Sequence, residues 1–177
     1  MLRTSIIGAL VLFLFGCAPW PYSYYLPSAD QGTLTHRGPN LTGPADAIVL
    51  EEQGYDVTVY YRGDLRIQLF VPEGKKLLLN EPVLVVYNEN SPNEPISFEF
   101  ILDNYGFSTN RHEYVGQKRS NPIQRNGTYF MANINIGKPN GKFKVQLPSF
   151  EIPGGKSLRF SSISFEEKSG VAVMPIN

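Results

Sequence analysis

The sequence predicts an all-β protein: an antiparallel two-sheet β-sandwich, of immunoglobulin-like or similar type, behind a leader and an extended tether. Beyond Ala47, apolar residues recur at every second position in run after run, which is the period of strands with one buried face. The 16 glycines and 14 prolines are scattered between these runs, where they mark turns. No run has a convincing helical period, and the gaps are too short for helical crossovers, so antiparallel pairing is expected.

Composition limits the function classes. The 177 residues suit one domain plus a tether, and 42% apolar residues suffice for a core. Lys plus Arg and Asp plus Glu both number 16, so no basic excess suggests a nucleic-acid partner. The single cysteine, Cys17, lies in the leader, which leaves the body without a disulfide or a thiolate metal cluster.

Residues 1–16 have the features of a signal peptide. Arg3 gives a basic start, and residues 6–15 form an apolar run. A ten-residue helix is about 15 Å long, half the roughly 30 Å thickness of a hydrocarbon core, so this run is short for a membrane span. Pro19 and Pro21 would break a helix that continued. An uncleaved membrane anchor is the alternative.

The four residues Leu14, Phe15, Gly16 and Cys17 resemble the lipobox of bacterial membrane lipoproteins. The resemblance implies cleavage between Gly16 and Cys17, a diacylglycerol on the Cys17 thiol, and often a further acyl chain such as palmitate on its amine. Phe15 departs from the pattern, because that position is usually smaller. Ala18 stands where Gram-negative lipoproteins retained in the inner membrane carry aspartate, so the resemblance implies a lipid-anchored location at the cell outer membrane. An ordinary secreted protein is the alternative.

Residues 17–46 are expected to form the lipidated tether, because they are rich in proline and polar residues and poor in apolar ones. The prolines at positions 19, 21 and 27 favour an extended stem that lifts the domain off the bilayer. Aromatic residues follow the leader directly: Trp20, Tyr22, Tyr24 and Tyr25. Such side chains suit the head-group layer. Packing against the domain is the equal alternative.

Residues 47–177 are expected to form the β-sandwich. Residues 55–61 and 65–71 alternate in polarity and are joined by Arg62-Gly63-Asp64, which predicts a hairpin. Residues 83–87 are apolar on both faces, as in a central strand. Further alternating runs cover residues 96–102, 130–136, 143–147 and 158–165. A single sheet closed on itself is the alternative, because alternation does not separate the two architectures.

The last run changes phase. Leu158 and Phe160 share one parity, whereas Ile163 and Phe165 share the other. The change falls at Ser161-Ser162, where we expect a bulge or a bend from one sheet to another.

The longest stretch without alternation, residues 103–125, is the candidate binding loop. Its amide, aromatic and charged groups could bind a sugar or a peptide, and the residues singled out are Asp103, Tyr105, His112 and Tyr114. A solvated loop is the favoured alternative.

The other motifs carry little chemistry. His36 and His112 are the only histidines, and neither has the spacing of a zinc site. No serine nucleophile motif is present, so no catalytic residue, metal or cofactor is expected. Arg62-Gly63-Asp64 matches an adhesion tripeptide, but a tight turn also requires glycine and aspartate.

The sequence therefore predicts a non-enzymatic envelope lipoprotein. Its partners would be the membrane, through the lipid on Cys17, and an envelope protein, in a structural or assembly role. The alternative function is a surface or periplasmic module that binds glycan or peptide.

Overall fold

The computed structural model describes residues 19–36, 44–89, 91–103, 113–117 and 125–173. These residues form fourteen strands and no helix: β1 (Pro19–Ser28), β2 (Thr33–Thr35), β3 (Ala47–Glu52), β4 (Tyr55–Arg62), β5 (Asp64–Pro72), β6 (Lys76–Leu79), β7 (Val83–Asn88), β8 (Ser91–Glu99), β9 (Glu113–Val115), β10 (Gly127–Ile134), β11 (Lys142–Gln146), β12 (Phe150–Ile152), β13 (Lys156–Leu158) and β14 (Ile163–Val173). The all-β prediction is confirmed.

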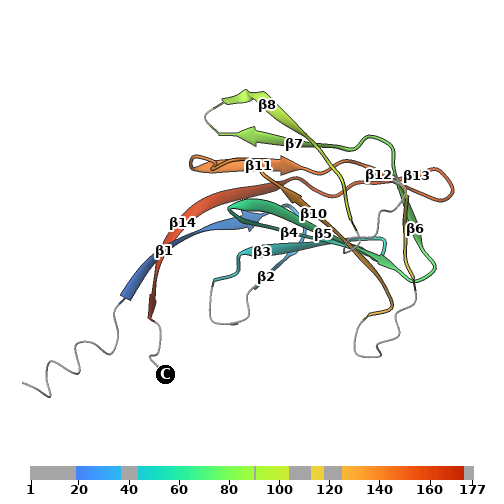
Figure 1. The fold of residues 1–177 in the computed structure, drawn as a ribbon, viewed down its shortest axis with the longest axis horizontal. Helices are drawn as coiled ribbons and strands as arrows, with labels where there is room; N and C mark the ends of the chain where they lie inside the picture. The colour runs from blue at the N-terminus through green and yellow to red at the C-terminus, as the bar shows by residue number, and fades with distance from the viewer. Residues whose placement is uncertain (1–18, 37–43, 90, 104–112, 118–124, 174–177) are drawn as a thin grey trace, which may run out of the picture. The chain divides into compact units, whose positions relative to one another are not determined.

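The strands lie in three sheets rather than the expected two (Figure 1). Sheet A has the order β1-β14-β11-β7-β8, sheet B the order β10-β5-β4-β3-β2, and sheet C the order β13-β12-β6-β9. Every pair with a defined register is antiparallel, as predicted. Sheet C consists of strands of three or four residues. Such strands are too short to show a period of two in the sequence.

The chain divides into two compact units. Unit 1 consists of Met1–Tyr24 and Lys168–Asn177, and unit 2 of Tyr25–Glu167. The described part of unit 1 contains the first residues of β1 and the last residues of β14, which are neighbouring strands.

The predicted hairpin is confirmed as β4 and β5. Val57 lies opposite Leu69, and Val59 lies opposite Ile67. Gly63 closes the turn at φ 81°, a left-handed conformation that glycine adopts without steric cost. The alternation places one face of both strands in the core.

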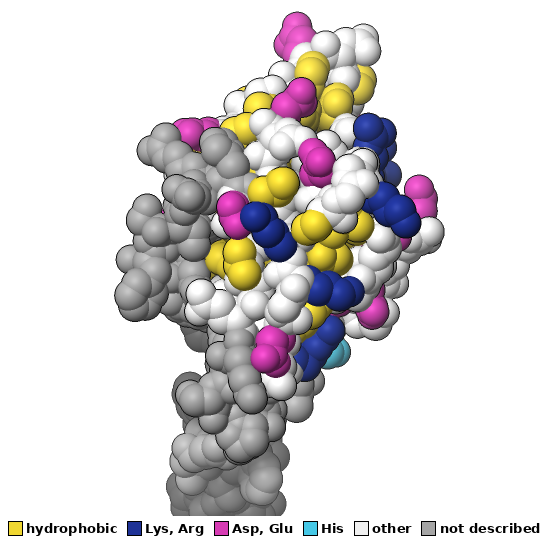
Figure 2. Space-filling view, turned by 90° about the vertical axis from the view of Figure 1, so that its right-hand side faces the viewer, with side chains coloured by type: hydrophobic (Ala, Val, Ile, Leu, Met, Phe, Trp, Pro, Cys, Tyr) yellow, Lys and Arg dark blue, Asp and Glu magenta, His cyan; other side chains and the backbone are white. Residues whose placement is uncertain are grey.

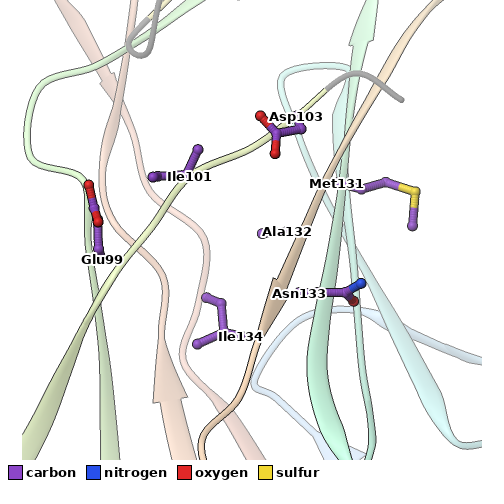
Figure 3. Close-up of a pocket in the computed structure, with 7 residues that line it drawn as sticks. All are labelled: Glu99, Ile101, Asp103, Met131, Ala132, Asn133 and Ile134. Carbon is purple, nitrogen blue, oxygen red and sulfur yellow. The ribbon is translucent and has the colours of Figure 1, made fainter. Parts of the chain in front are cut away.

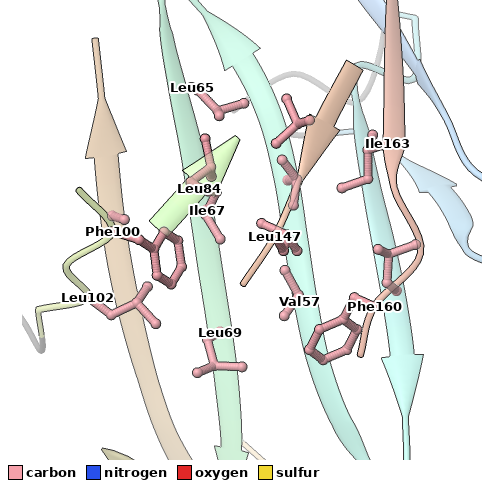
Figure 4. Close-up of a cluster of buried hydrophobic side chains, with 14 of the residues drawn as sticks. Val57, Leu65, Ile67, Leu69, Leu84, Phe100, Leu102, Leu147, Phe160 and Ile163 are labelled. Carbon is pink, nitrogen blue, oxygen red and sulfur yellow. The ribbon is translucent and has the colours of Figure 1, made fainter. Parts of the chain in front are cut away.

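All three sheets contribute to one hydrophobic core in unit 2. Val57, Leu69 and Phe160 are among the side chains that converge in Figure 4. Aromatic rings connect the sheets: Phe143 of β11 lies 5.5 Å from Tyr61 of β4 and stacks on Phe165 at 4.9 Å. Burial of such side chains is the main force that favours the folded state.

The phase change near the C-terminus is confirmed as a bend between sheets. β13 ends at Leu158 in sheet C, and β14 begins at Ile163 in sheet A. Phe160, between the two strands, is 9% exposed and belongs to the core. Residues 159–162 therefore carry the chain from sheet C to sheet A, and the parity of the buried positions changes along them.

The strand expected at residues 96–102 begins and ends earlier in the chain, and it is more exposed than its alternation suggested. β8 ends at Glu99 and forms one edge of sheet A, and its Ile96 is 46% exposed. Phe100 and Leu102 reach the core although they follow the strand. Prolines at positions 92 and 95 have no N–H to offer, which protects this edge from pairing with another chain.

Part of the expected tether is folded. Residues 19–28 and 33–35 form β1 and β2, which pair with β14 and β3. Tyr25 is 7% exposed, packs against Tyr61 at 4.9 Å and donates a hydrogen bond to the Pro139 carbonyl at 2.8 Å. For Tyr25, the structure thus supports packing against the domain. The side chain of Trp20 lies outside the described ones.

Buried tyrosines are expected to make the fold sensitive to alkali. Burial raises the pKa of four phenols above the ordinary value of 10.0: Tyr25, Tyr55, Tyr61 and Tyr114. The folded chain holds these protons more tightly than the unfolded chain. The contribution of these phenols to the unfolding free energy should therefore stay constant below about pH 10 and fall as the pH rises through the raised pKa values.

Thermal melts from about pH 8 to 12 test this expectation. Tyr61→Phe removes one of the four phenols and should make the alkaline decline in Tm shallower. The idea is wrong if the Tm is unchanged across the range, or if Tyr61→Phe declines as steeply as the parent.

Candidate functional site

An open cleft lies at one side of unit 2, between β10 and the segment that follows β8 (Figure 3). Its volume is about 460 Å³, within the range of ligand-binding pockets. It is lined by Glu99, Ile101, Asp103, Met131, Ala132, Asn133 and Ile134.

The path of the chain after β8 builds the cleft. Residues 100–103 leave sheet A with Phe100 and Leu102 buried, and they end at the edge of sheet B. There Asp103 and Met131 exchange two backbone hydrogen bonds of 2.8 Å each. This bridge closes one end, and the cleft opens between Glu99 and Ile134, where the two segments diverge (Figure 3).

β10 presents an open edge to the cleft. It is the last strand of sheet B, and within the described residues its backbone pairing away from β5 is limited to the bridge at Met131. In an antiparallel strand, backbone groups two residues apart point to the same side. The N–H and C=O groups of Asn133 therefore face the same side as those of Met131, where they can accept another strand.

The lining combines an apolar floor with an acidic rim. Ala132 and Ile134 lie on the side of β10 that faces Ile101, whereas Met131 and Asn133 point to the other side (Figure 3). Glu99 and Asp103 are exposed, and no Lys or Arg is among the lining residues. An extended segment with apolar side chains and a basic group would match this surface.

The predicted binding loop is only partly brought to this site. Asp103 lies on the cleft rim. Tyr114 is fully buried in β9, 5.0 Å from the Phe130 ring, which makes it a core residue with no surface for a ligand. Burial also raises the pKa of Tyr114. Tyr105 and His112 lie outside the described residues, as do Gly16 and Cys17.

The sequence predicted the buried face of β10 but not the cleft. Ala132 and Ile134 belong to an inward-facing set, and both are buried. One feature of the sequence could have indicated the cleft. Ile101 is apolar, although it lies between Phe100 and Leu102 at a position where the alternation calls for a polar residue. An apolar residue on the polar phase of a strand indicates a second contact surface.

The turn with the adhesion tripeptide has a structural role. Arg62 donates hydrogen bonds to the carboxylate of Asp46 through both Nε, at 2.8 Å, and Nη2. In the register of β4 and β5, Asp64 lies opposite Arg62 across the turn. The guanidinium and the turn are thus engaged within the domain.

A smaller hollow of about 380 Å³ lies on sheet A. Tyr87, Gln146 and Arg159 are among its lining residues, together with the apolar Val83 and Val85. Tyr87 and Gln146 lie within 3.5 Å of each other, from Oη to Oε1. An aromatic ring with amide and guanidinium groups nearby is a surface that can contact a sugar.

Charges are mixed on the face shown in Figure 2, where basic, acidic and hydrophobic side chains are interspersed. Within the described ranges, no group of three His, Cys, Asp or Glu residues is placed to hold a metal ion. The described part of the chain also contains no helix with the length and hydropathy of a membrane span.

Comparisons with protein-family models, with curated proteins and with solved structures gave no match to this chain.

Proposed function

We propose that this protein is a lipid-anchored lipoprotein of the cell envelope, with a non-catalytic β-domain that works by contact with a partner protein. The partner contributes an extended segment that adds to the free edge of β10. The open β10 edge beside an apolar cleft carries this proposal. A binding role of this kind needs no catalytic residue, metal or cofactor.

The chemistry of the cleft defines the segment. Strand addition uses the backbone groups of Asn133 for affinity, and the apolar floor receives every second side chain. The Glu99 and Asp103 carboxylates on the rim favour a segment with Lys or Arg beside its apolar residues. The outer-membrane location rests on the lipobox resemblance and on Ala18.

The proposal includes a finer description of the fold: a two-sheet sandwich of immunoglobulin-like or similar type, with sheet C at one end. The contact between Tyr61 of sheet B and Phe143 of sheet A supports it. The chain also passes between the sheets, from β8 in sheet A through β9 in sheet C to β10 in sheet B, and back to β11 in sheet A.

Cys17→Ala tests the anchor. The parent protein, extracted with detergent from its host, should have the mass of residues 17–177 plus a diacylglyceryl group on the thiol, with or without a third acyl chain on the amine, because the thioether and the amide are both stable bonds. The variant should remain an unprocessed precursor or leave the membrane fraction. A processed, membrane-bound Cys17→Ala protein would show that another element anchors the chain.

The partner site is tested by photo-crosslinking in cells from a benzoylphenylalanine placed at Glu99, on the exposed cleft rim. We expect an adduct with one envelope protein. Asn133→Pro should abolish the adduct, because proline removes the outward N–H that an added strand requires. Asn133→Ala keeps this N–H and is the matched control that should retain the adduct.

Folding of the proline variant is checked by circular dichroism.

Ile101→Lys is a second, independent test of the site. It places a charge in the cleft without changing a backbone hydrogen bond, and it too should abolish the adduct. An adduct that survives both variants would exclude the β10 edge. If Tyr87→Ala removed it instead, the site would be the hollow on sheet A, in accord with the alternative of a glycan- or peptide-binding module.

A further inference from the structure

We propose that unit 1 rests in the head-group layer of the membrane that holds the Cys17 lipid, with Tyr22 and Tyr24 as its contact residues. This inference rests on the proposed lipid anchor and adds how the domain is attached to it. The surface is the described part of unit 1, residues 19–24 of β1 and 168–173 of β14.

The short connection between the lipid and β1 is the first argument. β1 begins at Pro19, two residues after Cys17. Consecutive Cα atoms are at most about 3.8 Å apart, so the Cα atoms of Cys17 and Pro19 are at most about 7.6 Å apart. Each head-group layer is about 5–8 Å thick. A lipid on Cys17 therefore holds the start of β1 in or beside this layer, with no room for a long stem.

The aromatic side chains are the second argument. Tyr22 and Tyr24 are two positions apart on a strand, so they share a face, and their rings stack with centroids 5.7 Å apart. Both remain partly exposed. Tyrosine combines an apolar ring with a hydroxyl that can remain hydrated, which favours the membrane–water interface.

The Tyr22 ring lies close against Gly170 of the neighbouring strand β14. A Cβ atom on Gly170 of β14 would lie 2.8 Å from both Cζ and the hydroxyl oxygen of Tyr22. Glycine thus leaves the space that the Tyr22 ring occupies beside β14.

The charge of this surface is also compatible with a membrane. Within residues 19–24 and 168–173, Lys168 is the sole charged side chain, and no carboxylate is present. Anionic head groups would therefore meet no carboxylate side chain from these residues.

The chain has a single tryptophan, Trp20, which lies two residues before Tyr22 in the sequence and can report on the proposed contact. The experiment uses the mature protein purified from its host, with its acyl chains verified by intact mass, in vesicles of phosphatidylcholine and phosphatidylglycerol. We expect a blue-shifted Trp20 emission and quenching by lipids brominated near the head group. Quenching by aqueous acrylamide should fall about twofold or more relative to the lipid-free chain of residues 18–177.

The matched variants are Tyr22→Ser/Tyr24→Ser and, as the control, Tyr129→Ser, which changes a partly buried tyrosine of β10. The double variant should stay acylated but restore acrylamide access to Trp20, whereas Tyr129→Ser should not. If the acyl chains are present and Trp20 is quenched by acrylamide but not by brominated lipids, the membrane-contact proposal is overturned while the anchor stands. A protein without acyl chains would overturn both proposals.

Discussion

Gly116→Ala should lower the unfolding free energy by about 3 kcal/mol or more, because the new methyl group has no space. A Cβ atom at this position would overlap the carbonyl group of Pro72, which is backbone and cannot turn away. Backbone hydrogen bonds hold Gly116 there: its N–H donates to the Lys75 carbonyl at 2.9 Å, and its carbonyl accepts from Gly74 at 3.1 Å. A backbone shift large enough to relieve the overlap would break these two hydrogen bonds.

Urea unfolding followed by circular dichroism measures the loss. Gly141→Ala is the matched control, because Gly141 has φ 79° and open space around it. That variant carries conformational strain without a clash and should lose about 1 kcal/mol. Equal losses in the two variants would contradict the close approach of Gly116 to Pro72.

Phe143→Ala should cost about 3–5 kcal/mol, the range for removal of a large aromatic side chain from a core. Phe143 is 1% exposed and touches three other rings. It stacks on Phe165 at an interplanar angle of 8°, and it meets Tyr25 and Tyr61 edge-on at 5.4 and 5.5 Å. Its removal would leave a cavity between sheets A and B that these neighbours can fill only in part.

Lys144→Ala controls for the strand itself. Lys144 is the next residue of β11 and is exposed, so its removal should change the unfolding free energy by no more than about 0.5 kcal/mol. The midpoint in urea should shift strongly for Phe143→Ala alone. A small loss at Phe143 would mean that sheets A and B do not meet around its ring.

The candidate site was predictable only in part. The inward set of β10, with Ala132 and Ile134, followed from a period of two. The cleft did not, because it forms where residues 100–103 cross from sheet A to the edge of sheet B. Tyr114 shows the same limit. Three residues of β9 present no pattern, so only its pairing with β6 revealed a core position.

The sequence alone determined the all-β class, the β4–β5 hairpin and the bend near Ser161. These features depend on local alternation and on a glycine turn, which a few neighbouring residues encode. The tertiary structure decided which distant segments pair: β1 with β14, β6 with β9 and β12, and Asp103 with Met131. Backbone N–H and C=O groups pair in the same way whatever side chain they carry, so a short strand finds its partner through the packing of the whole core.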